Sequence, residues 1–301
     1  MNKEGVTVCI TAYKAQSYIK ECLDSVVNQS WFKDNDAFEI IVGIDGCEQT
    51  FEYMKTIMHN YKNLKVWMMD SNKGTYITSN TIMSRAKYEN VFRFDSDDIM
   101  CNNLVETVMK EKGNSVLVRY HLKDFGDEKN EVAVAHGTIY IKKSVFLKYG
   151  GFRPWPCGAD TELYCRLKNV ESVKNIKDIL MLRRVHDTSL TRAEDTGYKS
   201  ELRKKYKRLI KEMSIKKPED AIIKMETNTF KVVTTELQGD VNDYIKKLGT
   251  GRIIPKPVDH PKPEISVQPK VKSIVQLRDD IANGKVVRVK VNGGFIWKRI
   301  K

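Results

Sequence analysis

The 301-residue sequence lacks the long apolar segments that membrane-spanning and exported proteins carry. Its apolar runs, such as residues 40–44, are far shorter than the ~20 residues that a membrane-spanning helix needs. The first residues, MNKEG, lead into a strand-like segment and not into the apolar region of a signal peptide. We therefore expect a protein without a transmembrane segment that works in the cytoplasm.

The sequence also has no Cys-x-x-Cys pair among its six cysteines, which stand at irregular spacings. This excludes the usual patterns of a zinc ribbon and of a thioredoxin-like redox pair. Reduced thiols, as found in the cytoplasm, are the favoured interpretation. With 41% apolar and 9% aromatic residues, the chain has enough apolar side chains for a folded core.

The first two thirds of the chain carry no net charge. Residues 1–195 contain 27 basic and 27 acidic side chains, whereas residues 196–301 contain 25 basic and 12 acidic ones. The formal net charge of +13 therefore lies entirely in the last third. This distribution predicts a neutral body with a basic extension that meets an anionic partner or keeps the protein soluble.

Short apolar, β-branched runs alternate with helical patterns in the first half of the sequence. Such alternation predicts an α/β fold with a parallel sheet that helices cover on both faces. Ligands bind at the carboxyl ends of the strands in such sheets, where Asp45 and Asp95 stand. The expected strands are residues 6–11, 39–44, 64–69 and 90–94, and the expected helices are residues 15–28, 50–61 and 75–86.

The pattern is more mixed beyond residue 102. A strongly basic helix over residues 198–217 carries an apolar stripe, so we favour packing on the body with a solvated lysine face over binding to nucleic acid. Further strands are expected at residues 115–120, 138–141 and 179–185, and further helices at residues 143–149 and 160–168.

Five of the eight prolines fall within residues 255–269, which predicts a semi-extended linker. After a helix near residues 273–283, Asn292-Gly293-Gly294 separates two β-like runs and predicts a hairpin. The linker would allow this last module to dock on a neighbouring chain, so a homo-oligomer is a further expectation. The predicted divisions are a body (1–195), a basic, mainly helical extension (196–254), a linker (255–270) and a small basic β-hairpin module (271–301).

The strongest local motif is FDSDD at residues 94–98, directly after the fourth strand. Alternate carboxylates in a tight turn offer oxygen ligands to Mg²⁺ or Mn²⁺, and such a metal can hold a diphosphate. The alternative is an acidic helix start, which the helix dipole favours. The position at a strand end, together with Asp45, favours the metal site.

Several segments, taken in order, resemble the family 2 glycosyltransferases over about residues 5–192. The resemblance implies an α/β, glycosyltransferase A-type (nucleotide-diphospho-sugar transferase), Rossmann-like domain and transfer from a nucleotide-sugar, most often a UDP-sugar, with inversion. The segments are VCITAYK (8–14), YIKECLDSV (18–26) with Gln29, IIVGIDGC (40–47), NKG (72–74) with Asn80, FDSDD, GGF (150–152), ADTEL (159–163) and RVH (184–186).

The resemblance also assigns roles to individual residues. Asp160 would be the general base that deprotonates the acceptor, with Glu162 as the fallback because Ala159 replaces a frequent acid beside the base. Asp97 and His186 would contact the metal, Mn²⁺ or Mg²⁺, or the diphosphate. Asp45 would hydrogen-bond the uracil or ribose of the donor. The nucleotide-sugar site would consist of Thr11, Ala12, Tyr13, Asp45, Asn80, Asp95 and Ser96.

The acceptor is predicted less sharply. Trp155, in a proline-flanked loop before Asp160, would either stack on an acceptor or anchor its loop by burial. The basic extension favours a polyanion, such as a surface polysaccharide, a teichoic-type polymer, an anionic membrane surface or nucleic acid, including modified phage-type DNA. A non-catalytic protein that binds a nucleotide-sugar or a polyanion on the same fold is the alternative function, which Ala159 and the altered turn residues Ala12, Lys14 and Cys47 would fit.

Overall fold

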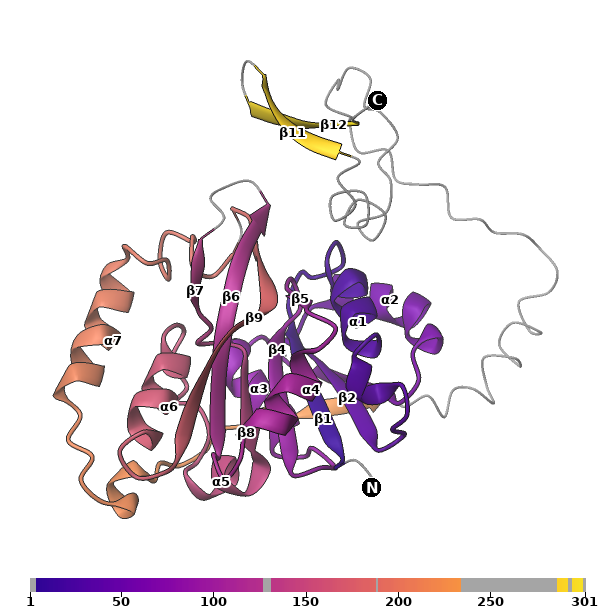
Figure 1. Ribbon diagram of the computed structural model, residues 1–301. Coiled ribbons are helices and arrows are strands. Elements are labelled where there is room, and N and C mark those ends of the chain that lie inside the picture. The colour runs from indigo at the N-terminus through magenta and orange to yellow at the C-terminus, as the bar shows by residue number, and fades with distance from the viewer. Residues whose placement is uncertain (1–3, 127–130, 188, 234–285, 292–293, 300–301) are drawn as a thin grey trace. The chain divides into compact units, whose positions relative to one another are not determined.

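The computed structural model describes residues 4–126, 131–187, 189–233, 286–291 and 294–299. The chain divides into two compact units, Met1–Lys247 and Leu248–Lys301. The described part of the first unit is built on a ten-stranded sheet with the strand order β10-β3-β2-β1-β4-β8-β6-β9-β5, in which β7 pairs with β6 (Figure 1).

The centre of this sheet is parallel, as the sequence predicts. The first strand along the chain, β1, pairs in parallel with β2 on one side and with β4 on the other, and β2 pairs in parallel with β3. Helices connect these strands, which is the crossover that parallel pairing requires. The elements are β1 (Val6–Ala12), α1 (Ile19–Val27), β2 (Phe38–Ile44), α2 (Glu48–Ile57), β3 (Leu64–Met69), α3 (Thr75–Met83) and β4 (Asn90–Asp95), with 3₁₀ turns at Ser30–Phe32 and Met58–Asn60.

The other half of the sheet is mixed, as is the sequence pattern beyond residue 102. Strand β8 pairs antiparallel with both β4 and β6, whereas β9 pairs in parallel with β6. The elements are β5 (Ile99–Met100), α4 (Leu104–Glu111), β6 (Leu117–Gly126), β7 (Val132–Val134), β8 (Ile139–Lys142), α5 (Lys143–Lys148), α6 (Ala159–Leu167) and β9 (Val173–Val185).

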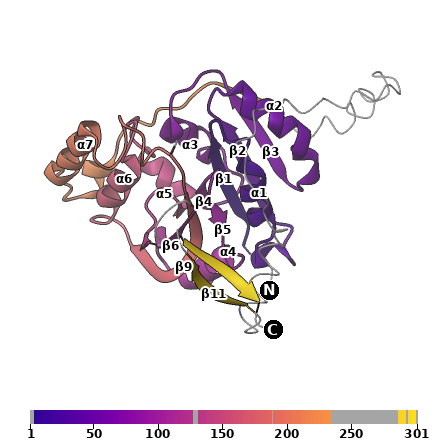
Figure 2. The ribbon, with the colours of Figure 1, turned by 90° about the horizontal axis from the view of Figure 1, so that it is seen from above.

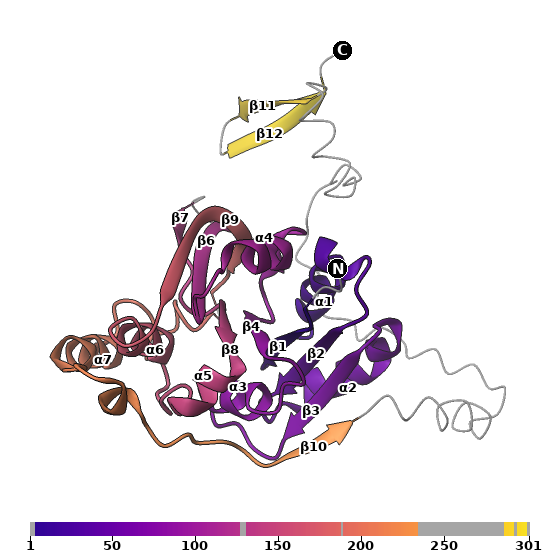
Figure 3. The same ribbon diagram turned by 60° about the horizontal axis from the view of Figure 1, so that its bottom comes forward.

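Two apolar clusters form the core, one on each face of the sheet. Along β1, Val8 and Ile10 belong to the cluster that packs on α1, α2 and α4, whereas Cys9 belongs to the one that packs on α3, α5 and α6. Successive strand residues point to opposite faces, so β1, which is buried along its whole length, serves both clusters. Figure 3 shows α1 and α4 on one side of the central strands and α3 and α5 on the other.

The first unit does not end at the predicted boundary after residue 195. Strand β10 (Phe230–Val233) pairs antiparallel with β3 and covers that edge of the sheet, and α7 (Glu201–Glu212) also belongs to this unit. Strands β10 and β3 are about 160 residues apart along the chain, and the sequence of neither strand indicates that they pair. A 3₁₀ turn at Pro218–Ala221 lies between the two elements, and residues 234–254 lie outside the described residues.

The second unit contains the predicted hairpin. Strands β11 (Val286–Val291) and β12 (Gly294–Arg299) pair antiparallel, with Val291 opposite Gly294. The predicted linker (255–270) and the helix near residues 273–283 lie outside the described residues. Among the helices that the structure describes, none is long and apolar enough to cross a membrane.

Candidate active site

The candidate site lies at the carboxyl ends of β1 and β4. These strands are neighbours, and their register places Thr11 opposite Asp95. Successive strands lie on opposite sides of β1, so this is the point where the strand order reverses and where ligands bind in open α/β sheets. Asp45 follows β2, on the other side of β1, so it is two strands away from Asp95 and not on the adjacent strand.

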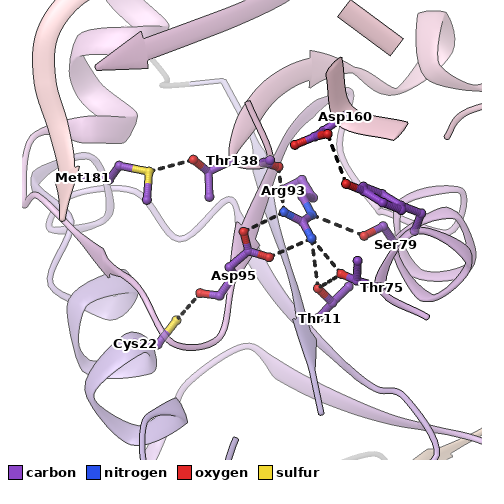
Figure 4. Close-up of polar contacts among 11 residues, drawn as sticks. Thr11, Cys22, Thr75, Ser79, Arg93, Asp95, Thr138, Asp160 and Met181 are labelled. Atoms are coloured by element: carbon purple, nitrogen blue, oxygen red, sulfur yellow. Dashed lines mark hydrogen bonds and ion pairs between the residues drawn. The ribbon is translucent and has the colours of Figure 1, made fainter. Parts of the chain in front are cut away.

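A buried arginine organises the site. The Arg93 guanidinium, on β4, is only 2% exposed and binds both carboxylate oxygens of Asp95, at 2.8 Å (Nη1–Oδ2) and 2.7 Å (Nη2–Oδ1). It also donates to Thr75 Oγ1 at 2.8 Å and to the carbonyl of Gly137 at 2.8 Å, and Figure 4 shows it at the centre of this network. A bidentate pair of this kind fixes the orientation of a carboxylate. Sequence reasoning missed Arg93, although a cation inside an apolar strand is a visible signal.

The Asp45 side chain is used within the protein. It is 3% exposed, and its carboxylate accepts hydrogen bonds from the backbone N–H groups of Lys73 and Gly74 and from Thr78 Oγ1, each at 2.9 Å. These donors stand at the start of α3, where a carboxylate offsets the unpaired N–H groups of the first turn. Gly46 is required beside it, because a Cβ there would lie 2.3 Å from the backbone N of Asn72. Asp45 therefore holds the 72–74 segment against the sheet.

The segment after β1 presents one large exposed side chain. Tyr13 is 49% exposed, whereas Thr11, Ala12 and Ser96 are buried. The Thr11 hydroxyl lies 2.9 Å from Thr75 Oγ1 and accepts from Arg93, so it belongs to the arginine network. Of the four residues, Tyr13 is therefore the one whose side chain reaches solvent widely enough to stack on a planar ligand.

Asn80 does not line the site, in contrast to its predicted contact with the nucleotide. Its side chain is fully buried, donates to the carbonyls of Phe152 (2.9 Å) and Glu226 (3.0 Å), and accepts from the N–H of Phe152 (2.9 Å). Gly151, with φ of +66°, lies so close that a Cβ there would be 2.5 Å from Asn80 Oδ1. These contacts make Asn80 a clamp between α3 and the GGF segment, with no exposed atom for a ligand.

Asp160 stands at the first turn of α6 and faces the arginine network. Its Oδ1 accepts hydrogen bonds from the Tyr76 hydroxyl at 3.1 Å and from the N–H of Thr161 at 2.8 Å. A Cβ on Gly137 would lie 3.2 Å from Asp95 Oδ2 and 3.6 Å from Asp160 Oδ2, so the two carboxylates border the same space. Burial and the nearby Asp160 carboxylate raise the pKa of the Tyr76 hydroxyl, which keeps it a donor.

Glu162, the predicted fallback base, is enclosed. It is 0% exposed, and its carboxylate pairs with Arg166 at 2.8 Å and with Arg153 at 2.9 Å. Arg166 is fully buried as well and donates to the carbonyls of Tyr149 and Ala221. This pair fixes α6, and with it Asp160, to the chain around it, so it does not serve as a base.

Asp97 and His186 lie together, next to the start of α1. The distance from His186 Nε2 to Asp97 Oδ2 is 2.9 Å, and the His186 ring is 5.0 Å from the Tyr18 ring. Within the described residues, no group of three or more His, Cys, Asp or Glu side chains is arranged to hold a metal. Mg²⁺ and Mn²⁺ are commonly held by one or two protein side chains together with substrate phosphates, so Asp97 and His186 fit a metal that a diphosphate ligand completes.

A third buried arginine, after Arg93 and Arg166, was not indicated by the sequence. Arg119 on β6 stacks on the Tyr164 ring at 3.3 Å and lies 3.1 Å (Nη1) from Nδ1 of His136. A guanidinium only donates hydrogen bonds, so His136 accepts at Nδ1 and carries its proton at Nε2. Burial and Arg119 lower the pKa of His136 against the opposing charge of Asp160. His136 directly precedes Gly137, the residue that lies next to the Asp95 and Asp160 carboxylates.

Trp155 packs on the basic helix. Its indole stacks on the Tyr206 ring of α7 at 4.3 Å, which covers one face of the Trp155 ring. The contact favours the anchoring role for Trp155 over acceptor stacking on that face. It also attaches α7 to residues 153–158, the segment that leads into α6 and Asp160.

Comparisons with known proteins identify the family and the fold. Residues 7–153 match the family model "Glycosyl transferase family 2". The chain is 24% identical over 218 residues to chondroitin synthase of Pasteurella multocida, which covers 65% of this chain and 22% of that protein. It therefore spans about a fifth of the length of that relative.

Solved structures show the same fold. Staphylococcus aureus TarS 1-349 in complex with UDP has a TM-score of 0.51 at 19% identity and covers 61% of each chain. The mannosyltransferase PcManGT from Pyrobaculum calidifontis, in complex with GDP-Man and Mn²⁺, has a TM-score of 0.56 at 15% identity and covers 71% of this chain and 66% of that one. The fold is thus that of the glycosyltransferase A-type nucleotide-diphospho-sugar transferases. Through residues 7–153 the chain belongs to the family 2 glycosyltransferases, which confirms the predicted family and fold class.

Proposed function

We propose that this protein is an enzyme that transfers a sugar from a nucleotide-sugar, a UDP-sugar in the first instance, to an acceptor hydroxyl with inversion. One observation carries the proposal. The Asp95 and Asp160 carboxylates border a single space at Gly137, one fixed by Arg93 on β4 and the other at the start of α6. The complexes of TarS with UDP and with UDP-GlcNAc, and of PcManGT with GDP-Man and Mn²⁺, support a nucleotide-sugar as the donor.

The donor would occupy the side of the site formed by β1, β4 and α1. The exposed Tyr13 ring offers an apolar face to the nucleoside base. Asp97 and His186 would hold Mn²⁺ or Mg²⁺. When bound, such a metal offsets the negative charge that develops on the leaving diphosphate. Arg93 keeps Asp95 in one orientation beside this charge.

The acceptor would approach from the side of α6. Its hydroxyl oxygen bonds to the anomeric carbon while the bond from that carbon to the diphosphate oxygen breaks on the opposite face. Asp160 takes the hydroxyl proton, a general-base contribution of about 10²–10⁴-fold. The Tyr76 hydroxyl and the Thr161 N–H bind Asp160 Oδ1, which leaves Oδ2, the oxygen nearer Gly137, for the acceptor.

The proposal is tested by the release of nucleoside diphosphate from a panel of UDP- and GDP-sugars with and without Mn²⁺ or Mg²⁺. We expect turnover of at least one donor, loss of turnover in EDTA and recovery on addition of metal. The Asp34→Asn variant, a change at an exposed carboxylate, serves as a matched control and should retain full activity. Tight binding of a donor with no turnover, across neutral and anionic glycan acceptors, would contradict the proposal and favour a non-catalytic nucleotide-sugar-binding protein.

A further inference from the structure

One face of α7 carries an exposed row of five cations, which we call the α7 basic face. The helix contains only two acidic side chains, Glu201 and Glu212. Among the described residues, only one of the five, Lys204, has an ion pair, at 2.6 Å to Glu201. Exposed charges without partners keep their full attraction for an anionic ligand. The face consists of Lys204, Lys205, Lys207, Arg208 and Lys211.

The opposite side of α7 is attached to the active-site half of the molecule. Tyr206 stacks on Trp155, and Arg203 donates to the carbonyl of Thr196 at 2.7 Å. Trp155 stands five residues before Asp160, in the segment that leads into α6. Figure 2 shows α7 next to α6, with α6 between α7 and the sheet, and Figure 1 shows the same neighbours. The basic face therefore lies on the acceptor side, beyond α6, and not on the donor side near α1.

We propose that the α7 basic face binds an anionic glycan, which is the acceptor of the proposed transfer reaction. The inference rests on that reaction, because the glycan must place a hydroxyl at Asp160. A rise of about 1.5 Å per residue spreads the cations from Lys204 to Lys211 over about 10 Å, a length that suits a chain with repeated charges better than one small anion. Carboxylates or phosphates on successive repeats would pair with these lysines.

Two other anionic partners fit the helix less well. A helix that binds a membrane surface turns its apolar residues outward to the lipid. In α7, Leu202, Tyr206 and Ile210 are half-buried against the protein, and only Leu209 is 40% exposed. Unmodified duplex DNA meets the charge requirement, but it has hydroxyls only at the chain ends, whereas a glycan offers hydroxyls on every repeat to a general base.

The test measures binding of the full-length chain to fluorescent polygalacturonate, a uronate polymer, at several salt concentrations. The variant K204Q/K207Q/K211Q removes three charges from the α7 basic face, and Gln keeps the helix propensity of Lys. The control K55Q/K62Q/K110Q removes three exposed lysines from the face of the molecule that carries α2 and α4. Neutral dextran is the control polymer, and circular dichroism checks the fold of each variant.

We expect the α7 variant to bind polygalacturonate at least ten-fold more weakly at low salt. Its slope of log K against log salt should fall by about 2, at about 0.7 for each lost contact, while the control variant keeps the slope of the wild type. Equal slopes for the two variants would overturn the proposal. So would α7-dependent binding to phosphatidylglycerol vesicles or to a 20-base-pair DNA duplex that exceeds binding to polygalacturonate.

The outcome for sugar transfer is separate. Release of nucleoside diphosphate with water as the acceptor should be the same in the α7 variant and the wild type, because α7 contacts no donor-side residue in the described structure. If the α7 variant loses polymer binding but keeps this hydrolysis, both proposals stand. If the wild type releases no nucleoside diphosphate with any donor and acceptor while polymer binding still depends on α7, the proposed reaction fails and the polymer surface remains.

Discussion

The charges of the active site and the charges of α7 are organised in opposite ways. Around Asp95 and Asp160, the cations Arg93, Arg119 and Arg166 are buried and fully engaged. On α7 the cations are exposed, and most have no partner within the described residues. Buried pairs fix geometry, and breaking one is costly, whereas exposed charges add little to stability and remain free for ligands. The contrast indicates that the first region positions reacting atoms and the second recruits a partner.

The largest effect should come from the buried Glu162–Arg166 pair. We predict that Arg166→Met destabilises the protein by about 3–5 kcal/mol, because Glu162 keeps its charge inside the protein with Arg153 as its remaining partner. Urea denaturation followed by circular dichroism measures this loss. The control Lys168→Met, at the exposed end of the same helix, should change the free energy of unfolding by less than about 1 kcal/mol. Equal effects of the two changes would remove the distinction between the regions.

The next largest effect should come from replacing Arg93 with lysine, which keeps the positive charge but not the two-point contact with Asp95. We predict that Arg93→Lys lowers the rate of diphosphate release by about 10²-fold, because one ammonium cannot hold both oxygens of Asp95 and a small misplacement of a reacting group has an effect of that size. Steady-state kinetics with the active donor measure the loss. Arg85→Lys, whose guanidinium lies over the Phe230 ring on the β3–β10 side, is the matched control. Activity of Arg93→Lys near that of the wild type would show that Asp95 needs no fixed orientation.

The smallest effect concerns His136. Its pKa is lowered in the folded protein by burial and by Arg119, so the unfolded chain binds the proton more readily. The contribution of His136 to stability is therefore complete above the ordinary histidine pKa of about 6.5 and decreases as the pH falls below it. NMR titration of the His136 ring measures the pKa directly. Arg119→Met should raise this pKa, and an unchanged value would mean that Arg119 does not act on the imidazole.

The parallel half of the fold could be predicted from the sequence because its strands are fully buried. Runs such as residues 40–44 are apolar throughout, which marks a strand covered on both faces. Strand β10 and the pairing of β8 with β4 could not be predicted, since these contacts join distant segments of ordinary composition. The basic helix packs on Trp155, in agreement with the packing on the body that its apolar stripe favoured, whereas the pairing of β10 with β3 was not expected.

The sequence motifs predicted where the site lies, but they did not distinguish the residues that face the site from those that hold the fold together. Asp95 and Asp160 come from segments 65 residues apart, and the fold brings both to Gly137. Asn80 has the position of a ligand contact in the sequence, yet its amide is occupied by Phe152 and Glu226. A local pattern does not reveal whether a polar side chain is already satisfied by the backbone of a distant segment. Burial and hydrogen bonding separate such clamps from groups that remain available to a substrate.

The central claim is that Asp160 acts as the general base and takes no part in binding the nucleotide of the donor. The most direct measurement compares Asp160→Asn with the wild type, by sugar transfer and by calorimetric titration with UDP and Mn²⁺. We predict that transfer falls by about 10²–10⁴-fold, the size of a lost general base, while UDP binds with nearly unchanged affinity. A parallel loss of UDP affinity, or transfer at the rate of the wild type, would contradict the account.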